Sequence, residues 1–248
     1  MNPQRFDRLD ALRGLAMVWM TVFHFVFDLR YFGMVTQDVV RDPFWTWQRT
    51  LIVSLFLLCA GMGQAIATAQ GQSWQRFWRR WAQVAGSALL VTAGSWLMFP
   101  QSFIYFGVLH GLALMLLVVR LTAHWGRSLW WLGALAISSK FLAEGVLQTG
   151  PLAPWADVFN NMRWNWIGWI SQKPVTEDYV PLFPWLGVMW WGAAAGTWLL
   201  KHQSDWLAQP LAQGVKALAG LGRWSLSYYL LHQPVLIALV GGVSWFLR

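Results

Sequence analysis

The chain has 248 residues, of which 57% are hydrophobic and only 11% are charged. Soluble globular domains carry nearer a quarter charged residues, so this composition excludes a soluble enzyme and a disordered tail. The single cysteine, Cys59, excludes a disulfide framework and a cysteine-ligated metal site. The net charge of +8 is better explained by Lys- and Arg-rich cytoplasmic loops than by nucleic-acid binding.

Seven long apolar stretches follow one another, each close to the roughly 17–25 residues that a helix needs to cross a bilayer. They are 11–29, 51–69, 81–99, 103–119, 128–147, 181–200 and 224–247. We therefore predict an all-α polytopic bundle of about seven transmembrane helices, forming one integral membrane domain over 1–248. Most of the Lys and Arg residues fall on one side if the N-terminus is cytoplasmic, which predicts an N-in, C-out orientation.

Two segments outside these stretches have a character of their own. Segment 148–180 is long and includes Pro151, Pro154 and an Asn-Asn pair, which favours a partly helical external lid; a plain connector is the alternative. Segment 206–222 is short and weakly amphipathic, so we expect it at the cytoplasmic surface and not across the membrane.

The first apolar stretch carries two groups that are costly at membrane depth, His24 and Asp28. They are four residues apart, so a helix puts them on one face. His24 follows Arg13 by eleven residues, roughly 16 Å at helical rise, which places it past the midplane toward the outside. A carboxylate next to an imidazole can fix its tautomer and support a general base, so we predict a catalytic pair. The alternative for Asp28 is an interfacial ion pair with Arg30.

Other polar residues within the stretches have a plain interpretation beside the functional one. Lys140 and Glu144 are also four apart, and a structural ion pair facing the bundle is favoured over a proton relay. His110 and His232 are single histidines, for which hydrogen-bonded packing is the plain interpretation. A proline two residues after His232 predicts a polar kink.

Two further patterns bear on packing and on metals. Gly192 and Gly196 are spaced for a close contact between helices. No pair of histidines has HxxxH or HExxH spacing, so we expect no metal site.

Several short motifs occur in a definite order along the chain. The first reads Arg8-Leu9-Asp10-Ala11-Leu12-Arg13-Gly14, and Phe23-His24-Phe25 and Phe27-Asp28-Leu29 follow it. The later ones are Leu55–Gly61, Ile104–His110, Pro181–Gly187, Leu221–Leu226 and Tyr229–Val235. In this order they closely resemble the DUF1624 family of small bacterial membrane proteins, related to the catalytic domain of heparan-α-glucosaminide N-acetyltransferase within the wider transmembrane acyltransferase superfamily.

This resemblance implies transmembrane acyl transfer by a protein of the bacterial inner membrane. Acetyl-CoA or another acyl-CoA would approach from the cytoplasm, and the acyl group would reach an amine or hydroxyl acceptor, such as a sugar, on the external side. In the superfamily the histidine that follows D-x-x-R-G is the expected base, and His24 matches it. In the lysosomal enzyme the catalytic histidine is placed after the first span, but this sequence has no histidine between Phe25 and Leu109.

The resemblance also suggests which other residues would take part. The phosphates of CoA would meet arginines at the cytoplasmic mouth: Arg13, Arg76, Arg79 and Arg80. Taken alone, the basic loop is better explained as a topology signal. Polar residues in or near the spans would support the substrate or the oxyanion: Asp10, Arg49, Tyr105, His110, Lys140, Glu144, His232 and Gln233.

Two other classes of function stay open at this point. A proton-coupled transporter would use Lys140, Glu144 and the histidines as a relay, while a non-catalytic membrane subunit would use the face of Gly192 and Gly196. As partners we expect the lipid bilayer, acyl-CoA and the acceptor, with no nucleic acid; a homodimer is an open alternative.

Overall fold

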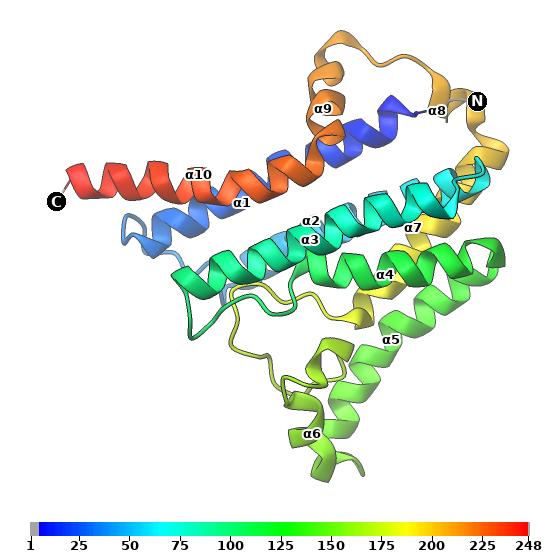
Figure 1. The fold of residues 1–248 in the computed structure, drawn as a ribbon. Coiled ribbons are helices and arrows are strands. Elements are labelled where there is room, and N and C mark those ends of the chain that lie inside the picture. Colours follow the sequence, from blue (N-terminus) through cyan, green and yellow to red (C-terminus); the bar gives the residue numbers. More distant parts are fainter. Residues whose placement is uncertain (1–4, 248) are drawn as a thin grey trace. The chain divides into compact units, whose positions relative to one another are not determined.

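The computed structural model describes residues 5–247, which fold into helices joined by turns, without a β-strand. Each of the seven apolar stretches falls mainly in one long helix (Figure 1). These are α1 (Asp7–Tyr31), α2 (Pro43–Ala69), α3 (Trp74–Met98), α4 (Val108–Thr122), α5 (Ser128–Gln148), α7 (Leu182–His202) and α10 (Ser225–Phe246). The all-α prediction is confirmed for the described residues.

Four of the described helices are long and apolar enough to cross a membrane by length and composition: α1, α2, α10 and the segment Val108–Trp125 that contains α4. The chain is therefore a membrane protein with several apolar spans. The helices α3, α5 and α7 are 25, 21 and 21 residues long but fall outside that set. The total of seven spans and the N-in, C-out orientation stay predictions.

Local sequence explains where several helices begin and end. Ser73 lies just before α3, and its Oγ accepts a hydrogen bond from the backbone N–H of Arg76, which caps the helix. Gly33 and Gly71 follow α1 and α2 with φ of 75° at each, a left-handed conformation that suits glycine and stops a helix. Each glycine lies at the start of a loop, and a residue with a side chain would be strained at this positive φ.

The chain divides into two compact units. We call residues 57–203 the central unit, and residues 5–56 together with 204–247 the terminal unit. The helix α2 runs across the boundary between Phe56 and Leu57. Each unit has its own set of packed helices and is described separately.

In the central unit, α4 packs against α3 and α7, and α7 also packs against α5. The indole N–H of Trp81 on α3 donates to the carbonyl of Ala113 on α4 at 2.9 Å, and that of Trp190 on α7 donates to Oγ1 of Thr122 at 2.9 Å. Trp191 on α7 likewise donates to the carbonyl of Trp130 on α5 at 2.9 Å. Tryptophans thus join α3, α4, α5 and α7 through indole hydrogen bonds as well as through apolar area.

Glycines on α7 permit close contact with the central-unit part of α2. A Cβ added at Gly192 would lie 2.3 Å from the carbonyl oxygen of Leu58, and one at Gly196 would lie 2.8 Å from the backbone of Met62. Such distances leave no room for a side chain, because real Cβ atoms do not approach backbone below 3.0 Å. The predicted close-packing role of Gly192 and Gly196 is confirmed.

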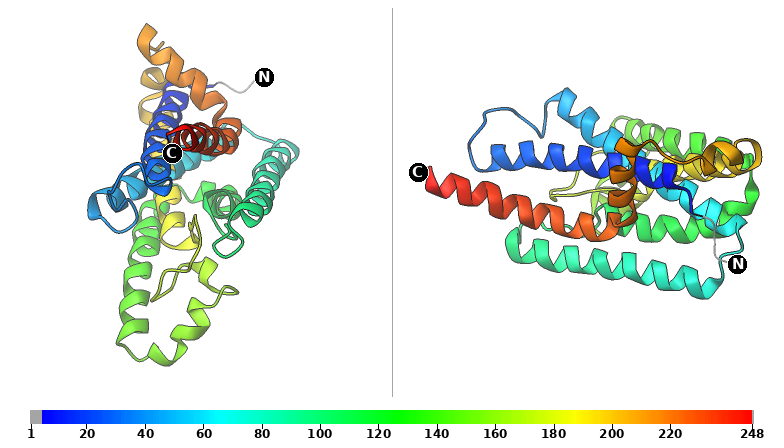
Figure 2. Two further views of the ribbon diagram at one scale, coloured as in Figure 1. Left: turned by 90° about the vertical axis from the view of Figure 1, so that its left-hand side faces the viewer. Right: turned by 90° about the horizontal axis from the view of Figure 1, so that it is seen from above.

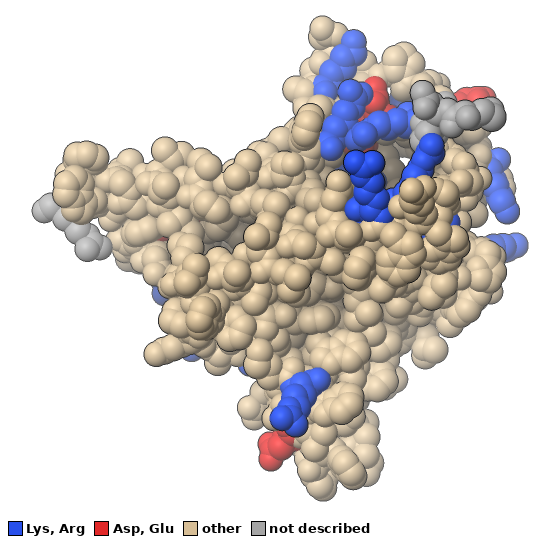
Figure 3. Space-filling view, viewed as in Figure 1, with Lys and Arg blue, Asp and Glu red and all other residues tan. Residues whose placement is uncertain are grey.

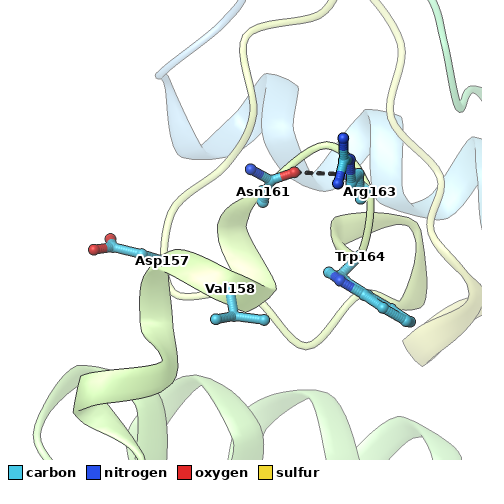
Figure 4. A pocket seen from close by; sticks show the side chains of 5 residues that line it. All are labelled: Asp157, Val158, Asn161, Arg163 and Trp164. Atoms are coloured by element: carbon cyan, nitrogen blue, oxygen red, sulfur yellow. Dashed lines mark hydrogen bonds between the residues drawn. The ribbon is translucent and has the colours of Figure 1, made fainter.

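Segment 148–180 contains three short helical pieces, η2 (Ala153–Trp155), α6 (Ala156–Asn160) and η3 (Asn165–Ile167). It also carries a shallow, open hollow lined by Asp157, Val158, Asn161, Arg163 and Trp164 (Figure 4). The backbone N–H of Arg163 donates to Oδ1 of Asn161 at 3.0 Å on one side of this hollow. The segment is partly helical as predicted, and its role as a lid stays a prediction.

In the terminal unit, α1 packs along both α9 (Gln213–Arg223) and α10, and also touches the short α8 (Ser204–Ala208) (Figure 1 and Figure 2). A cluster of buried apolar side chains fills its core: Ala16, Met17, Met20, Phe23, Val39 and Ile52. The indole N–H of Trp19 donates to Oε1 of Gln48 at 2.8 Å and holds the first half of α2 to α1. At 11 residues α9 is too short to span the membrane, and the expected place of 206–222 at the cytoplasmic surface stays a prediction.

Charge is distributed unevenly over this unit. Lys and Arg gather where α1 begins and α9 lies, whereas the face of α10 carries no charged side chain (Figure 3). An uncharged helix of 22 residues is what a lipid-facing span requires, and a basic end is typical of a cytoplasmic boundary.

Candidate functional site

The terminal unit brings four polar residues together between α1 and α10: His24, Asp28, His232 and Gln233. The two residues from α1 were predicted to form a pair, and the two from α10 to support them. Nδ1 of His24 lies 2.6 Å from Oε1 of Gln233, and Nε2 of Gln233 donates to Oδ1 of Asp28 at 2.8 Å. The rings of His24 and His232 meet edge to face with centroids 5.0 Å apart.

These contacts assign the proton on the imidazole of His24. When it is ionised, the carboxylate of Asp28 can only accept hydrogen bonds, so the NH₂ of Gln233 then faces it and the amide oxygen faces His24. An amide oxygen also accepts only, so Nδ1 of His24 carries the hydrogen. In the neutral ring, Nε2 is then an unprotonated nitrogen with a free lone pair. This is the state that a general base needs.

His232 has the same tautomer for a different reason. Its Nδ1 donates to the backbone carbonyl of Tyr229 at 2.7 Å, so Nε2 holds a lone pair in the neutral ring. That Nε2 is buried and has no hydrogen-bond partner among the described residues. A buried acceptor without a donor costs roughly 1–3 kcal/mol.

Asp28 is placed at a cost that packing alone does not explain. Its side chain is 1% exposed, it lies in the last turn of α1 where the helix dipole disfavours an anion, and its Oδ2 has no partner among the described residues. The interfacial pair with Arg30 is absent, because the Arg30 guanidinium donates to the carbonyls of Thr36 and Gln37. Asp28 therefore acts toward Gln233, and the direct carboxylate–imidazole contact expected from spacing is replaced by a contact through an amide.

Two residues of this cluster were missed from the sequence. Tyr228 stacks on His232 at an interplanar angle of 7°, and its hydroxyl lies 2.6 Å from Oγ1 of Thr21. Thr21 donates to the carbonyl of Met17, so the Tyr228 hydroxyl is the donor of the pair. Helical spacing was the available signal, since Thr21 and Tyr228 lie three and four residues before His24 and His232, on the same faces.

The D-x-x-R-G motif forms a separate ionic cluster near the start of α1. Asp10 is 1% exposed and accepts hydrogen bonds from Nε of Arg5 and from Nη1 of Arg13, the latter at 2.9 Å. Nε of Arg223 lies 3.9 Å from the same carboxylate, and its Nη2 bonds Asp7 at 2.6 Å. A buried carboxylate with this many cations is an anchor between α1 and α9.

Two glycines allow the backbones of α1 and α9 to touch at this anchor. A Cβ at Gly222 would lie 1.8 Å from the carbonyl oxygen of Asp10, and one at Gly14 would lie 2.0 Å from the carbonyl oxygen of Leu218. The motifs Arg8–Gly14 and Leu221–Leu226, more than 200 residues apart, thus pack on each other. Asp10 and Arg13 are explained by this packing, and the charge of Arg13 is committed in part to Asp10.

His110 in the central unit has both ring nitrogens occupied. Its Nδ1 accepts from the backbone N–H of Gly107 at 3.3 Å, and its Nε2 lies 3.0 Å from Oγ1 of Thr92, which itself donates to the carbonyl of Ile104. His110 is thereby the N3 residue of the capping arrangement that begins α4. These contacts are better explained by a structural role than by catalysis.

We therefore expect His110→Ala to lower the free energy of unfolding by about 0.5–2 kcal/mol, the usual range for a lost helix cap, with little effect on the kcat of acyl transfer. Thermal unfolding in detergent and a turnover assay on the same sample check this. A normal melting curve with abolished turnover would contradict the structural assignment.

Two further sets of predicted site residues lie in the central unit: Lys140 with Glu144, and Tyr105 with its hydrogen-bond partners. Nζ of Lys140 and Oε2 of Glu144 lie 2.5 Å apart, so the predicted ion pair is confirmed. In the loop before α4, the Tyr105 hydroxyl accepts from Nδ2 of Asn165 at 2.7 Å, and the Tyr179 hydroxyl donates to the Asn165 carbonyl at 2.6 Å. Burial raises the pKa of the Tyr105 and Tyr179 phenols, so both stay protonated at neutral pH.

The predicted phosphate-binding arginines differ in environment. Arg76, Arg79 and Arg80 are exposed in the first two turns of α3, whereas Arg13 is half-buried beside Asp10. Arg49 lies half-buried on the terminal-unit part of α2. Among the described residues, no three His, Cys, Asp or Glu side chains are grouped so that they could hold a metal ion.

The family model of the heparan-alpha-glucosaminide N-acetyltransferase catalytic domain matches residues 5–234. The chain belongs to this family. The match spans nearly all of both units and includes every motif on which the resemblance was based, except that it ends just before Val235. Comparison with curated proteins gives no match, and comparison with solved structures gives none. Membership points to acetyltransferase enzymes of membranes.

Proposed function

We propose that the protein is a transmembrane acyltransferase that moves an acyl group, acetyl in the first instance, from acyl-CoA to an amine or hydroxyl acceptor. The observation that carries the proposal is His24, a membrane-helix histidine whose Nδ1–H is held by Gln233, so that the neutral ring keeps its lone pair on Nε2. Family membership supports the acetyltransferase class. In this proposal the donor is used from the cytoplasm, and the acceptor, a sugar, is acylated on the external side of a bacterial inner membrane.

The chain's own residues would carry the proton in this reaction. As the acceptor N–H or O–H attacks the thioester carbonyl, its proton moves to Nε2 of His24, and the ring becomes an imidazolium. The same proton then passes from His24 to the departing thiolate sulfur, so acyl acceptor and free thiol are the products and the histidine is unchanged. Throughout, Nδ1–H stays bonded to Gln233.

The amine or hydroxyl compound that receives the acyl group could donate hydrogen bonds to lone pairs at this site. Oδ2 of Asp28 and Nε2 of His232 are buried acceptors without partners among the described residues. An amine or hydroxyl brings the hydrogens that these atoms lack, which favours such a nucleophile over an anionic ligand. Together with Nε2 of His24, these atoms would suit an acyl acceptor that is rich in hydrogen-bond donors.

Acyl-CoA supplies the thioester carbonyl and a thiol leaving group when it is bound. The exposed guanidinium groups of Arg76, Arg79 and Arg80 fit the phosphates of such a donor, because arginine forms bidentate, charge-assisted hydrogen bonds to phosphate. Arg13 fits less well, because Asp10 already takes part of its hydrogen-bonding capacity.

The proposal is tested by reconstituting the full chain in lipid vesicles with acetyl-CoA and a series of acceptors that includes glucosamine and simple amino and hydroxyl compounds. Thiol release that depends on an acceptor, together with an acylated product of the expected mass, is the expected result. Proton-gradient-driven uptake without thiol release would favour the transporter instead, and neither activity would favour a non-catalytic subunit.

In the same assay, changing Arg76, Arg79 and Arg80 together to Ala is expected to raise the KM for acetyl-CoA about tenfold or more, because a hydrogen bond to a charged group contributes roughly 1.5–3 kcal/mol. The kcat at saturating donor should change little. Arg41→Ala, an exposed arginine in the loop between α1 and α2, is the matched control. An unchanged KM in the triple variant would remove these arginines from the donor site.

A further inference from the structure

We propose that Gln233 is a positioning residue that transmits the orientation of Asp28 to His24, so that Asp28, Gln233 and His24 act as one carboxylate–amide–imidazole chain. The proposal rests on the proposed role of His24 as base. It goes further in assigning how the base is kept in one tautomer, and which residue from the opposite end of the sequence does so.

The chain of contacts has only one consistent direction. Gln233 sits between the other two side chains, with its Oε1 2.6 Å from His24 Nδ1 and its Nε2 2.8 Å from Asp28 Oδ1. If the amide were inverted, its oxygen would face the carboxylate and its NH₂ would face Nδ1, so two acceptors would oppose each other. Asp28 thereby excludes the inverted amide, and the inverted amide is the one that would move the hydrogen of His24 to Nε2.

Burial strengthens the preference for this orientation of the Gln233 amide. Asp28 is 1% exposed, and Gln233 and His24 are half-buried, so water competes poorly with these bonds. The connection also joins α1 to α10 across 205 residues of sequence. A direct carboxylate–imidazole bond would give the same tautomer, but here the carboxylate one helical turn from His24 accepts its hydrogen bond from Gln233 instead.

The arrangement matters most when His24 is protonated. An imidazolium donates from both nitrogens, and the oriented amide oxygen remains in place to accept from Nδ1–H. The negative carboxylate behind the amide polarises it in the favourable direction. No side chain must rotate during the proton transfer, which is the property of a preorganised site.

The test moves the negative charge from position 28 to position 233. In Asp28→Asn the partner of Gln233 can donate as well as accept, so the Gln233 amide is free to invert and the correct tautomer is no longer enforced. In the double variant Asp28→Asn with Gln233→Glu, the amide introduced at position 28 donates to the carboxylate introduced at position 233, and that carboxylate accepts from Nδ1–H of His24. The double variant has the charge of the wild type and restores the tautomer by a different route.

We expect Asp28→Asn to lower kcat about tenfold or more with a small change in KM, because only the base is affected. Gln233→Met, which keeps the length of the side chain and removes the amide, should lower kcat similarly. The double variant should recover most of the kcat that Asp28→Asn loses.

The tautomer itself is read from the ¹⁵N chemical shifts of His24 in labelled protein, which do not depend on turnover. Nδ1–H in the wild type, a mixture or Nε2–H in Asp28→Asn, and Nδ1–H again in the double variant support the proposal. Nδ1–H retained in Asp28→Asn, or a double variant no better than that single variant, overturns it. If no acceptor supports turnover, the spectra decide the proposal separately from the proposed function.

Discussion

Replacement of His24 by Ala is expected to lower the kcat of acyl transfer by about 10²- to 10⁴-fold, the range that general-base catalysis contributes. The reason is that the substitution removes the one nitrogen, Nε2, whose lone pair is kept free by the bonds to Gln233 and Asp28. The KM for acetyl-CoA should change little, because the arginines assigned to the donor lie on α3. Initial rates of thiol release over a range of acetyl-CoA concentrations give both constants.

His202→Ala is the matched control for this change. His202 is an exposed histidine in the last turn of α7, and its Nδ1 bonds only the carbonyl of Trp198 within the same helix. The His202→Ala variant should turn over acetyl-CoA at the rate of the unaltered protein. If both histidine variants kept full activity while their melting curves matched the wild type, His24 would not be the base.

Gly222→Ala is expected to destabilise the terminal unit by about 1–3 kcal/mol, the usual cost of overpacking. The added Cβ would lie 1.8 Å from the carbonyl oxygen of Asp10, where backbone faces backbone and neither can move aside cheaply. Because Arg223 on α9 is hydrogen-bonded to Asp7 on α1 and lies near Asp10, a shift of α9 would also loosen the ionic anchor. The loss is measured as a fall in the midpoint of thermal unfolding in detergent.

Gly220 offers a control two residues away on the same helix. A Cβ there meets nothing within 4 Å, so Gly220→Ala should be neutral or stabilise the helix by up to about 1 kcal/mol. The two glycine substitutions therefore differ clearly in their effect on the unfolding midpoint. Equal shifts for both would mean that α1 and α9 do not pack in the way described.

The helices, and the polar residues within their apolar stretches, could be predicted from the sequence. Stretches of 17–24 apolar residues predict long helices because no other single segment satisfies its own backbone in lipid, and each of the seven stretches is mainly helical. His24, Asp28 and His232 stood out for the same reason, since polar groups are expensive there. The ion pair of Lys140 with Glu144 followed from helical spacing alone.

The hydrogen-bond and packing partners of these residues could not be predicted, because they come from distant parts of the chain. The spacing of His24 and Asp28 suggested a direct contact, and nothing in it reveals that an amide from residue 233 lies between them. The D-x-x-R-G motif suggested a donor site, while Asp10 and Gly14 are packed against α9. His110 was indistinguishable by sequence from a catalytic histidine until its two nitrogens were found bonded to Gly107 and Thr92.

The most direct test of His24 as the base is a single-turnover experiment in sealed vesicles with acetyl-CoA labelled in its acetyl group. We expect the label to pass to the acceptor in the unaltered protein and in His202→Ala, and to stay on acetyl-CoA in His24→Ala. Transfer of label at the same rate in His24→Ala, with a wild-type melting curve, would contradict the claim that Nε2 of His24 is the base for acyl transfer.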